Sequence, residues 1–170
     1  MNYSPDLGGI IYQVASMARR EGGISFAGGY PDPELFDTEG LAAAFDGMFA
    51  DDFRVALQYG DREGFGPLRA RLAAFSSGSG RIVAPEEVIV ANGGQQGIAT
   101  ATRVLTQPGD TVFMESPTFP TALQAFLLAR VNGVAVESDR NGLVPESLEQ
   151  LLRVQRPKLL YIVPTFSNPA

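Results

Sequence analysis

The chain has 170 residues, of which 45% are hydrophobic and 19% charged, and its net charge is −6. This composition is typical of a globular protein with one good core, and the acidic balance without a cluster of Lys and Arg argues against nucleic-acid binding. Because Cys and His are both absent, we expect neither thiolate chemistry nor a metal site. We see no signal peptide and no apolar run of membrane-spanning length, so we expect a cytoplasmic protein without membrane contact.

Residues 1–50 are predicted to form an N-terminal segment of helices and loops. Apolar residues at helical spacing indicate a helix over Leu7–Arg20. The glycines and prolines that follow predict an irregular loop. Asp37 or Thr38 is then placed to cap a helix from Glu39 to about Phe49.

Two predicted helices carry an apolar stripe that we expect to face the core. The stripe of the first helix consists of Leu41, Phe45, Met48 and Phe49. The stripe of the second, which follows a glycine-punctuated loop, consists of Leu68, Leu72 and Phe75. The Ser/Gly run at 76–80 then ends the second helix as a surface loop.

After Pro85, strands and helices alternate regularly. The predicted strands are 87–91, 110–115, 133–137 and 159–163, and the predicted helices are 95–106, 119–130 and 145–154. Such alternation implies right-handed crossovers between parallel strands. The predicted fold class is therefore α/β, with a mostly parallel sheet and helices on both faces.

Ligands of such sheets bind at the carboxyl ends of the strands. Three segments follow strands here: Asn92–Gln95, Glu115–Phe119 and Pro164–Pro169. The glycines of the first segment open a helix, whose unpaired N–H groups and dipole suit a phosphate or a carboxylate. Glycine also serves simply to turn the chain, and the run matches neither the dinucleotide nor the nucleoside-triphosphate motif. Together the three segments suit a flat, phosphorylated, hydroxylated heterocycle.

Five motifs in chain order resemble the class I and II aminotransferases of fold type I, which use pyridoxal 5'-phosphate. They are the run 24–36, the segment 57–69, Gly93–Gln96, Glu115–Phe119 and Pro164–Pro169. The first is similar to the substrate-side loop of the 2-aminoadipate and kynurenine aminotransferase subgroup. The resemblance implies that residues 51–170 form the first half of the cofactor-binding large domain, truncated at the C-terminus and preceded by the segment 1–50.

The resemblance assigns a role to each matching residue. Gly93, Gly94 and Gln95 would hold the cofactor phosphate, Phe119 would stack on the ring, and Asn168 would bond the ring oxygen. Tyr59 would reach the phosphate bound by the other subunit of a homodimer. Gly29 and Tyr12 would lie on the substrate side, where an amino acid and a 2-oxo acid bind. Tyr12 stands where the aminoadipate-type enzymes carry an Arg, which argues against a dicarboxylic substrate.

Several of these residues also have plain structural explanations. Without the resemblance, Tyr59 would be explained as an ordinary loop aromatic and Phe119 as a core residue. Asn168, which precedes a proline, would be explained as a turn residue. Asp110 and Glu115, at strand ends, are expected to be solvated or capping residues rather than acid–base groups.

The chain also departs from the family pattern at its end, because it stops at Ala170. The family's later residues, including the Schiff-base lysine, would follow, so no catalytic residue is expected within the chain. The single lysine, Lys158, precedes a strand and would lie at the edge opposite the ligand. We therefore expect the chain alone to be inactive.

Two other functions remain open on the same fold. One is a pyridoxal-phosphate-binding transcriptional regulator, although Met1 leaves little room for a preceding DNA-binding domain. The other is a decarboxylase or lyase, since fold does not fix function.

Overall fold

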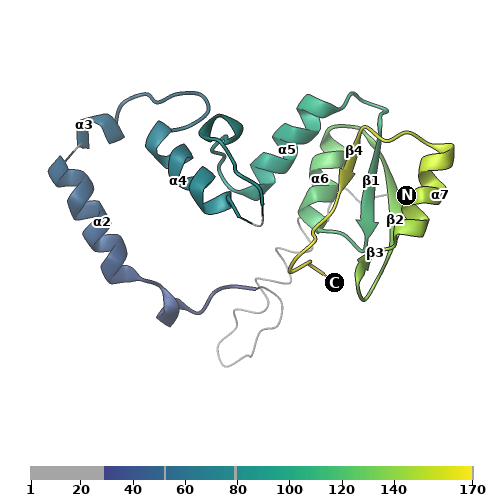
Figure 1. Ribbon diagram of the computed structural model, residues 1–170, viewed down its shortest axis with the longest axis horizontal. Coiled ribbons are helices and arrows are strands. Elements are labelled where there is room, and N and C mark those ends of the chain that lie inside the picture. Colours follow the sequence, from purple (N-terminus) through teal and green to yellow (C-terminus); the bar gives the residue numbers. More distant parts are fainter. Residues whose placement is uncertain (1–28, 52, 79, 170) are drawn as a thin grey trace. The chain divides into compact units, whose positions relative to one another are not determined.

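The computed structural model describes residues 29–169 except Asp52 and Ser79. The described residues form two compact units, and the boundary between them in the sequence lies between Val90 and Ala91. The elements and the described residues are drawn in Figure 1. The helix predicted over Leu7–Arg20 lies outside the described residues. Each unit is therefore described by itself.

The unit that ends at Val90 is helical. Its elements are η1 (Pro33–Leu35), α2 (Thr38–Asp51), α3 (Phe53–Ala56), α4 (Gly66–Ser76) and η2 (Pro85–Glu87). The predicted cap of α2 is confirmed, because the Gly40 N–H donates to Asp37 Oδ1 at 2.8 Å. An aspartate at this position accepts from N–H groups of the first turn, which have no partner within the helix.

The expectation that the stripes of α2 and α4 are buried is wrong for this chain. Phe45 is 57% exposed and Phe75 is 89% exposed, and the other stripe residues are exposed or only half-buried. Of α4, only Ala73 is buried. A stripe shows which face of a helix favours burial, but burial needs a second surface. Within this unit α2 packs on α3 and α4 on η2, and neither contact covers the stripe.

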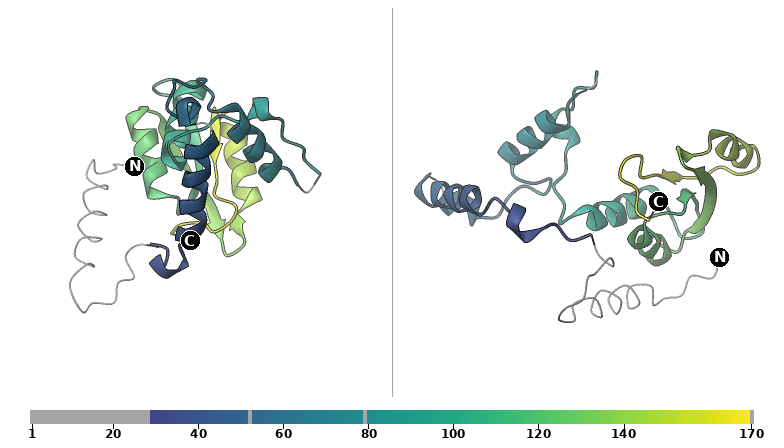
Figure 2. Two further views of the ribbon diagram at one scale, coloured as in Figure 1. Left: turned by 90° about the vertical axis from the view of Figure 1, so that its left-hand side faces the viewer. Right: turned by 90° about the horizontal axis from the view of Figure 1, so that it is seen from below.

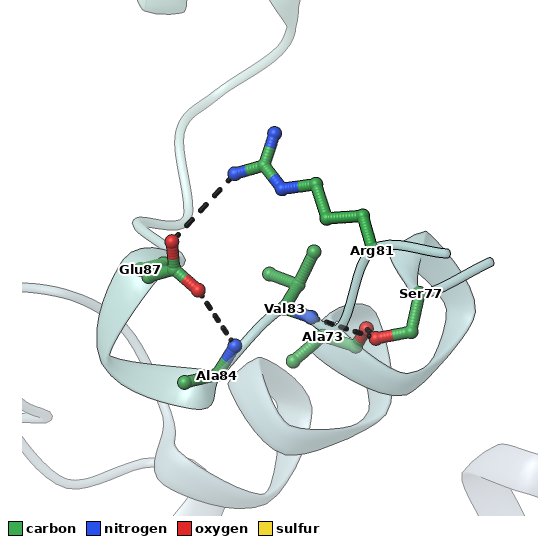
Figure 3. A network of polar contacts seen from close by, with 6 residues as sticks. All are labelled: Ala73, Ser77, Arg81, Val83, Ala84 and Glu87. Atoms are coloured by element: carbon green, nitrogen blue, oxygen red, sulfur yellow. Dashed lines mark hydrogen bonds and ion pairs between the residues drawn. The ribbon is translucent and has the colours of Figure 1, made fainter. Parts of the chain in front are cut away.

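The predicted Ser/Gly loop after α4 is held by a small polar network (Figure 3). The Val83 N–H donates to Ser77 Oγ at 2.9 Å, and the Ala84 N–H donates to Glu87 Oε2 at 2.9 Å. Arg81 forms an exposed ion pair with Glu87 at 3.6 Å. The loop is thus tied to the end of α4 and to η2, while its tip stays on the surface.

The strand predicted around Val88–Val90 is also wrong: Val88 has an extended backbone, but the segment joins no sheet. The Val90 N–H donates to the Glu63 carbonyl at 2.8 Å, and Arg69 Nε donates to the Val88 carbonyl at 2.8 Å. A loop and an arginine therefore take the hydrogen bonds that a neighbouring strand would have made.

The unit that begins at Ala91 contains the sheet. Its strands are β1 (Thr111–Ser116), β2 (Asn132–Asp139), β3 (Gly142–Leu143) and β4 (Leu159–Tyr161), in the spatial order β3-β2-β1-β4. β1 pairs in parallel with β2 and β4, and β2 pairs antiparallel with β3. The predicted α/β fold with a mostly parallel sheet is confirmed, and the short β3 hairpin is an addition.

Three helices complete this unit: α5 (Gly94–Leu105), α6 (Pro120–Leu128) and α7 (Pro145–Val154). β2 and β4 flank β1 in the sheet. The connection through α6 leads from β1 to β2, whereas the connection through α7 leads in the opposite direction, back past β1 to β4. Right-handed crossovers in opposite directions place their helices on opposite faces, and the right-hand view of Figure 2 shows the strands between α6 and α7. The direction of winding therefore reverses between β1 and β4.

The core of this unit lies between the sheet and α6. Val112 and Met114 of β1 pack on Ala122 and Phe126, all at most 3% exposed. Side chains alternate along a strand, so the neighbouring Phe113, fully buried, faces the opposite side. The central strand is thus buried on both faces, as expected for a parallel sheet with helices on each side.

Candidate functional site

A cavity of about 470 Å³ opens where the winding of the sheet reverses. In open α/β sheets this place, beyond the carboxyl ends of the strands, is where ligands bind. The cavity is lined by Gly94, Gln95, Ile98, Phe119, Thr121, Tyr161, Val163, Phe166 and Asn168. Its walls come from the start of α5, the segment after β1 and the segment after β4.

The first wall is the glycine turn before α5. Gly93 is the N-cap residue, and its φ of 83° lies in the left-handed region that favours glycine. No side chain caps this helix, so the first-turn N–H groups of Gly94 and Gln95 have no partner from the cap. Nothing lies within 4 Å of where a side chain would stand on Gly93 or Gly94. The turn therefore offers free N–H donors and open space for an anion.

The second wall is the segment that joins β1 to α6. Phe119 is the N-cap residue of α6, and it packs against the core cluster while lining the cavity. The buried hydroxyls of Thr118 and Thr121 have no hydrogen-bond partner among the described residues. Thr121 lines the same cavity, so this wall combines an aromatic ring with an unsatisfied buried hydroxyl.

The third wall is the end of β4 with the loop that follows. Tyr161 packs edge-on against Phe126, with ring centroids 5.6 Å apart. Burial raises the pKa of the Tyr161 phenol, and the negative charge of Glu115 raises it further. Beyond it, Asn168 lines the cavity and is exposed to solvent.

Glu115 is a residue of this region that the sequence did not reveal. We expected a solvated or capping carboxylate, but Glu115 is only 6% exposed. Its Oε1 accepts a hydrogen bond from the Val163 N–H at 2.8 Å, across 48 positions of sequence. Asp110, the other strand-end acid, does cap a turn, since its Oδ2 accepts from the Gln107 N–H at 2.7 Å.

The structure brings four of the predicted site residues to one cavity: Gly94, Gln95, Phe119 and Asn168. Gly93, the fifth, directly precedes Gly94 as the N-cap residue of α5.

The structure does not relate the remaining predicted residues to this cavity. Tyr59 and Gly29 belong to the unit that ends at Val90, and Tyr59 is 100% exposed. Tyr12 lies outside the described residues. Lys158 is exposed, and its N–H donates to the Thr111 carbonyl at 2.8 Å, at the amino end of the strands. It therefore lies at the edge opposite the cavity, as the sequence predicted.

Two kinds of feature are absent from the described residues. No helix among them is long and apolar enough to cross a membrane. No group of three or more His, Cys, Asp or Glu side chains in the same part of the chain is placed to hold a metal ion.

Several known proteins resemble this chain in sequence and in fold. The chain is 37% identical to the 2-aminoadipate transaminase of Thermus thermophilus, over 94% of this chain and 39% of that protein. LysN, the α-aminoadipate aminotransferase of Thermus thermophilus solved with N-(5'-phosphopyridoxyl)-L-leucine, aligns with a TM-score of 0.80 at 35% identity, over 93% of this chain and 41% of that one. The kynurenine aminotransferase of Pyrococcus horikoshii aligns with a TM-score of 0.84 at 32% identity, over 100% of this chain and 42% of that one.

This chain thus spans about two fifths of the length of these relatives. The family described as aminotransferase class I and II matches residues 27–170. The chain belongs to the class I and II aminotransferases.

Proposed function

We propose that the whole protein is a pyridoxal-phosphate-dependent aminotransferase, which moves an amino group from an amino acid to a 2-oxo acid. The observation that carries this proposal is the cavity at the reversal point of the sheet. It gathers a glycine turn with free N–H groups, an aromatic ring and a side-chain amide within about 470 Å³. Aminotransferases of this family use pyridoxal 5'-phosphate, and their substrates are amino acids and keto acids.

The residues of the cavity fit this cofactor in charge and shape. A phosphate dianion suits the uncapped start of α5, where the positive end of the helix dipole adds to the N–H donors. A flat ring suits Phe119, because offset stacking favours two aromatic faces. The unpaired Thr121 hydroxyl is a further polar group that a ligand in the cavity would satisfy.

Each residue would then have a defined task. The N–H groups of Gly94 and Gln95, with the turn at Gly93, would hold the phosphate. Phe119 would fix the plane of the ring, and the Asn168 amide would donate a hydrogen bond to the ring oxygen. When bound, pyridoxal 5'-phosphate supplies an aldehyde that reacts with amines and a ring that accepts electrons. The contribution of these residues is orientation and charge stabilisation.

The residues outside the cavity enter this proposal from the family resemblance. Tyr59 would contact the phosphate of the other subunit in a homodimer, which would give its exposed side chain a charged partner. Gly29 and Tyr12 would lie on the substrate side. We keep the division into a segment 1–50 and a half-domain 51–170 as part of the proposal.

We propose that Lys158 does not attach the cofactor, and its position at the amino end of the strands supports this. The attaching lysine would belong to the part of the protein that the relatives have beyond this chain. The chain alone would then carry part of the cofactor site without the covalent anchor, and it would be inactive.

The experiment that tests the proposal compares two matched glycine variants of the full-length protein. Gly94→Asp puts a negative charge into the phosphate site, whereas Gly97→Asp puts the same charge one turn further along α5. A Cβ atom added at either glycine meets no atom within 4 Å. We expect Gly94→Asp to weaken pyridoxal 5'-phosphate binding by roughly a hundred-fold, since the added carboxylate repels the phosphate at close range and competes with it for the same N–H donors.

In the same titration, Gly97→Asp is expected to bind nearly as the unmodified protein does. Equal binding by the unmodified protein and both variants would show that the phosphate does not bind at the start of α5. Transamination of a panel of amino acids by the full-length protein would then identify the donor.

A further inference from the structure

Glu115 lies at the point where β4 stops following β1. The parallel ladder between these strands ends at the pair Met114 and Tyr161. Two residues later, the Val163 N–H has a side-chain partner, Glu115 Oε1, at 2.8 Å. The carboxylate thus takes the place of the next backbone acceptor and ties the departing chain to the end of β1.

The tied segment is a wall of the cavity. Val163, Phe166 and Asn168 all line the cavity and follow one another within six residues. Among the described residues of 163–169, this hydrogen bond is the polar tie between the loop and the sheet. The loop that carries Asn168 is therefore bonded to the sheet by this one polar contact, at its start.

Burying the Glu115 carboxylate has a cost. The side chain is 6% exposed, and neither ion pair in the described part of the chain involves it. A buried charge without a cation lowers stability unless hydrogen bonds compensate it. The Val163 N–H supplies such a hydrogen bond.

We infer that Glu115 is a positioning residue: its carboxylate holds Val163, and through the loop 163–168 it sets Asn168 at the cavity. The consequence for catalysis rests on the proposed function, because it requires that Asn168 contacts the cofactor ring. The positioning itself is a property of the chain and is measurable without any ligand.

Two substitutions separate the hydrogen bond from the charge. Glu115→Gln keeps an acceptor oxygen at the same length and removes the charge, whereas Glu115→Leu removes both. Glu137→Leu is the matched control, since Glu137 lies in β2 beside the end of β1 but is exposed. Amide exchange and resonance positions would be measured by NMR on the 170-residue chain.

We expect Glu115→Leu to accelerate exchange of the Val163 amide by roughly ten- to a hundred-fold, as for the loss of a hydrogen bond to a charged group. The Asn168 resonances should move with it. Glu115→Gln should preserve most of the protection at Val163 and leave Asn168 in place, because its amide oxygen still accepts. In the same Gln variant the Tyr161 phenol should titrate at lower pH, because the carboxylate charge is gone.

The core amides of Val112 and Val136 and the Glu137→Leu control should be unchanged. The inference is overturned if Val163 exchange stays the same in Glu115→Leu, or if Val112 accelerates as much as Val163 does. It is also overturned if the Val163 amide loses its protection against exchange in Glu115→Gln as it does in Glu115→Leu. Should Glu115→Leu not fold, the Gln variant alone decides, through Val163 protection together with the Tyr161 titration.

A second measurement, pyridoxal 5'-phosphate affinity of the full-length protein, separates the two proposals. Weaker binding in Glu115→Leu and near-normal binding in Glu115→Gln support both. If the unmodified protein does not bind the cofactor, the proposed function fails, whereas the exchange data still decide the role of Glu115.

Discussion

The two units of the chain differ in what their helices pack against. In the sheet unit, α6 lays Ala122 and Phe126 on Val112 and Met114 of β1, and all four side chains are buried. In the other unit, α2 leaves Phe45 more than half exposed, although the sequence gives both helices an apolar face. The difference teaches that the sheet, by offering a flat apolar surface, turns helix faces into a core.

The comparison also bears on the proposed site. Every wall of the cavity comes from the sheet unit, where elements distant in sequence are fixed by packing. The residues proposed to act from the other unit, Tyr59 and Gly29, are exposed. Under the proposed function, the sheet unit would hold part of the cofactor site by itself, whereas Tyr59 and Gly29 would act only against a partner surface.

The largest expected effect is the complete absence of turnover by the 170-residue chain. Lys158 lies at the amino end of the strands, opposite the edge where the proposed function puts the cofactor. We therefore expect no transamination of any amino acid and no pyridoxyl adduct after borohydride treatment, as measured by mass spectrometry. A borohydride-stable adduct on Lys158, together with turnover, would contradict the proposed site.

The next effect tests the contrast in burial. Phe126→Ala should destabilise the chain by about 3–5 kcal/mol, because it opens a cavity in a packed core and removes the contact with Tyr161. Phe45→Ala, the same change on the exposed stripe of α2, should cost less than about 1 kcal/mol. Urea unfolding followed by circular dichroism measures both. Equal losses would mean that the α2 stripe is covered in solution.

The third effect concerns the exposed Tyr59 and needs the full-length protein. Tyr59→Phe removes a single donor, and we expect cofactor affinity to fall by roughly ten- to a hundred-fold. A mixed dimer of Tyr59→Phe and Gly94→Asp subunits gives the direction of the contact. Its open site lies in the Phe subunit and is served by the intact Tyr59 of the partner, so it should bind normally. Weak binding there would place the contact within one chain.

The sequence correctly predicted features that depend only on neighbouring residues, such as helix starts and caps. Pro145 predicted the first residue of α7, and Asp37 predicted the cap of α2. The turn into β3 consists of Arg140 and Asn141, and it is followed by Gly142, whose φ of 110° favours glycine; our prediction did not use this signal.

Errors arose wherever the outcome depended on distant partners. Val88–Val90 has the composition of a strand, but its hydrogen bonds go to Glu63 and Arg69. Likewise, the buried Glu115 accepts its hydrogen bond from Val163, 48 positions away, which no local pattern indicates. The cavity was partly predictable, because the rule for strand ends selected Gly94, Phe119 and Asn168 from the sequence alone. Thr121 and Tyr161 were missed, since neither belongs to a motif.

The smallest expected effect tests whether losing one backbone-to-carboxylate hydrogen bond changes the stability of the two units differently. Asp37 caps the start of α2 in one unit, and Asp110 accepts from the Gln107 N–H in the turn before β1 in the other. Replacing either by Ala removes a backbone-to-carboxylate hydrogen bond worth about 1 kcal/mol. Because β1 lies at the centre of the core, Asp110→Ala should lower the urea midpoint of the whole sheet unit.

Asp37→Ala should instead act locally, because α2 packs chiefly on the short α3. We expect amide exchange in the first turns of α2 to accelerate about five-fold, with the urea midpoint of the sheet unit unchanged. Asp46→Ala, an exposed change in the middle of α2, is the control and should accelerate neither. If Asp37→Ala shifted the midpoint as much as Asp110→Ala, the helical unit would unfold together with the sheet. The two units would then have the same stability, although their helices are packed differently.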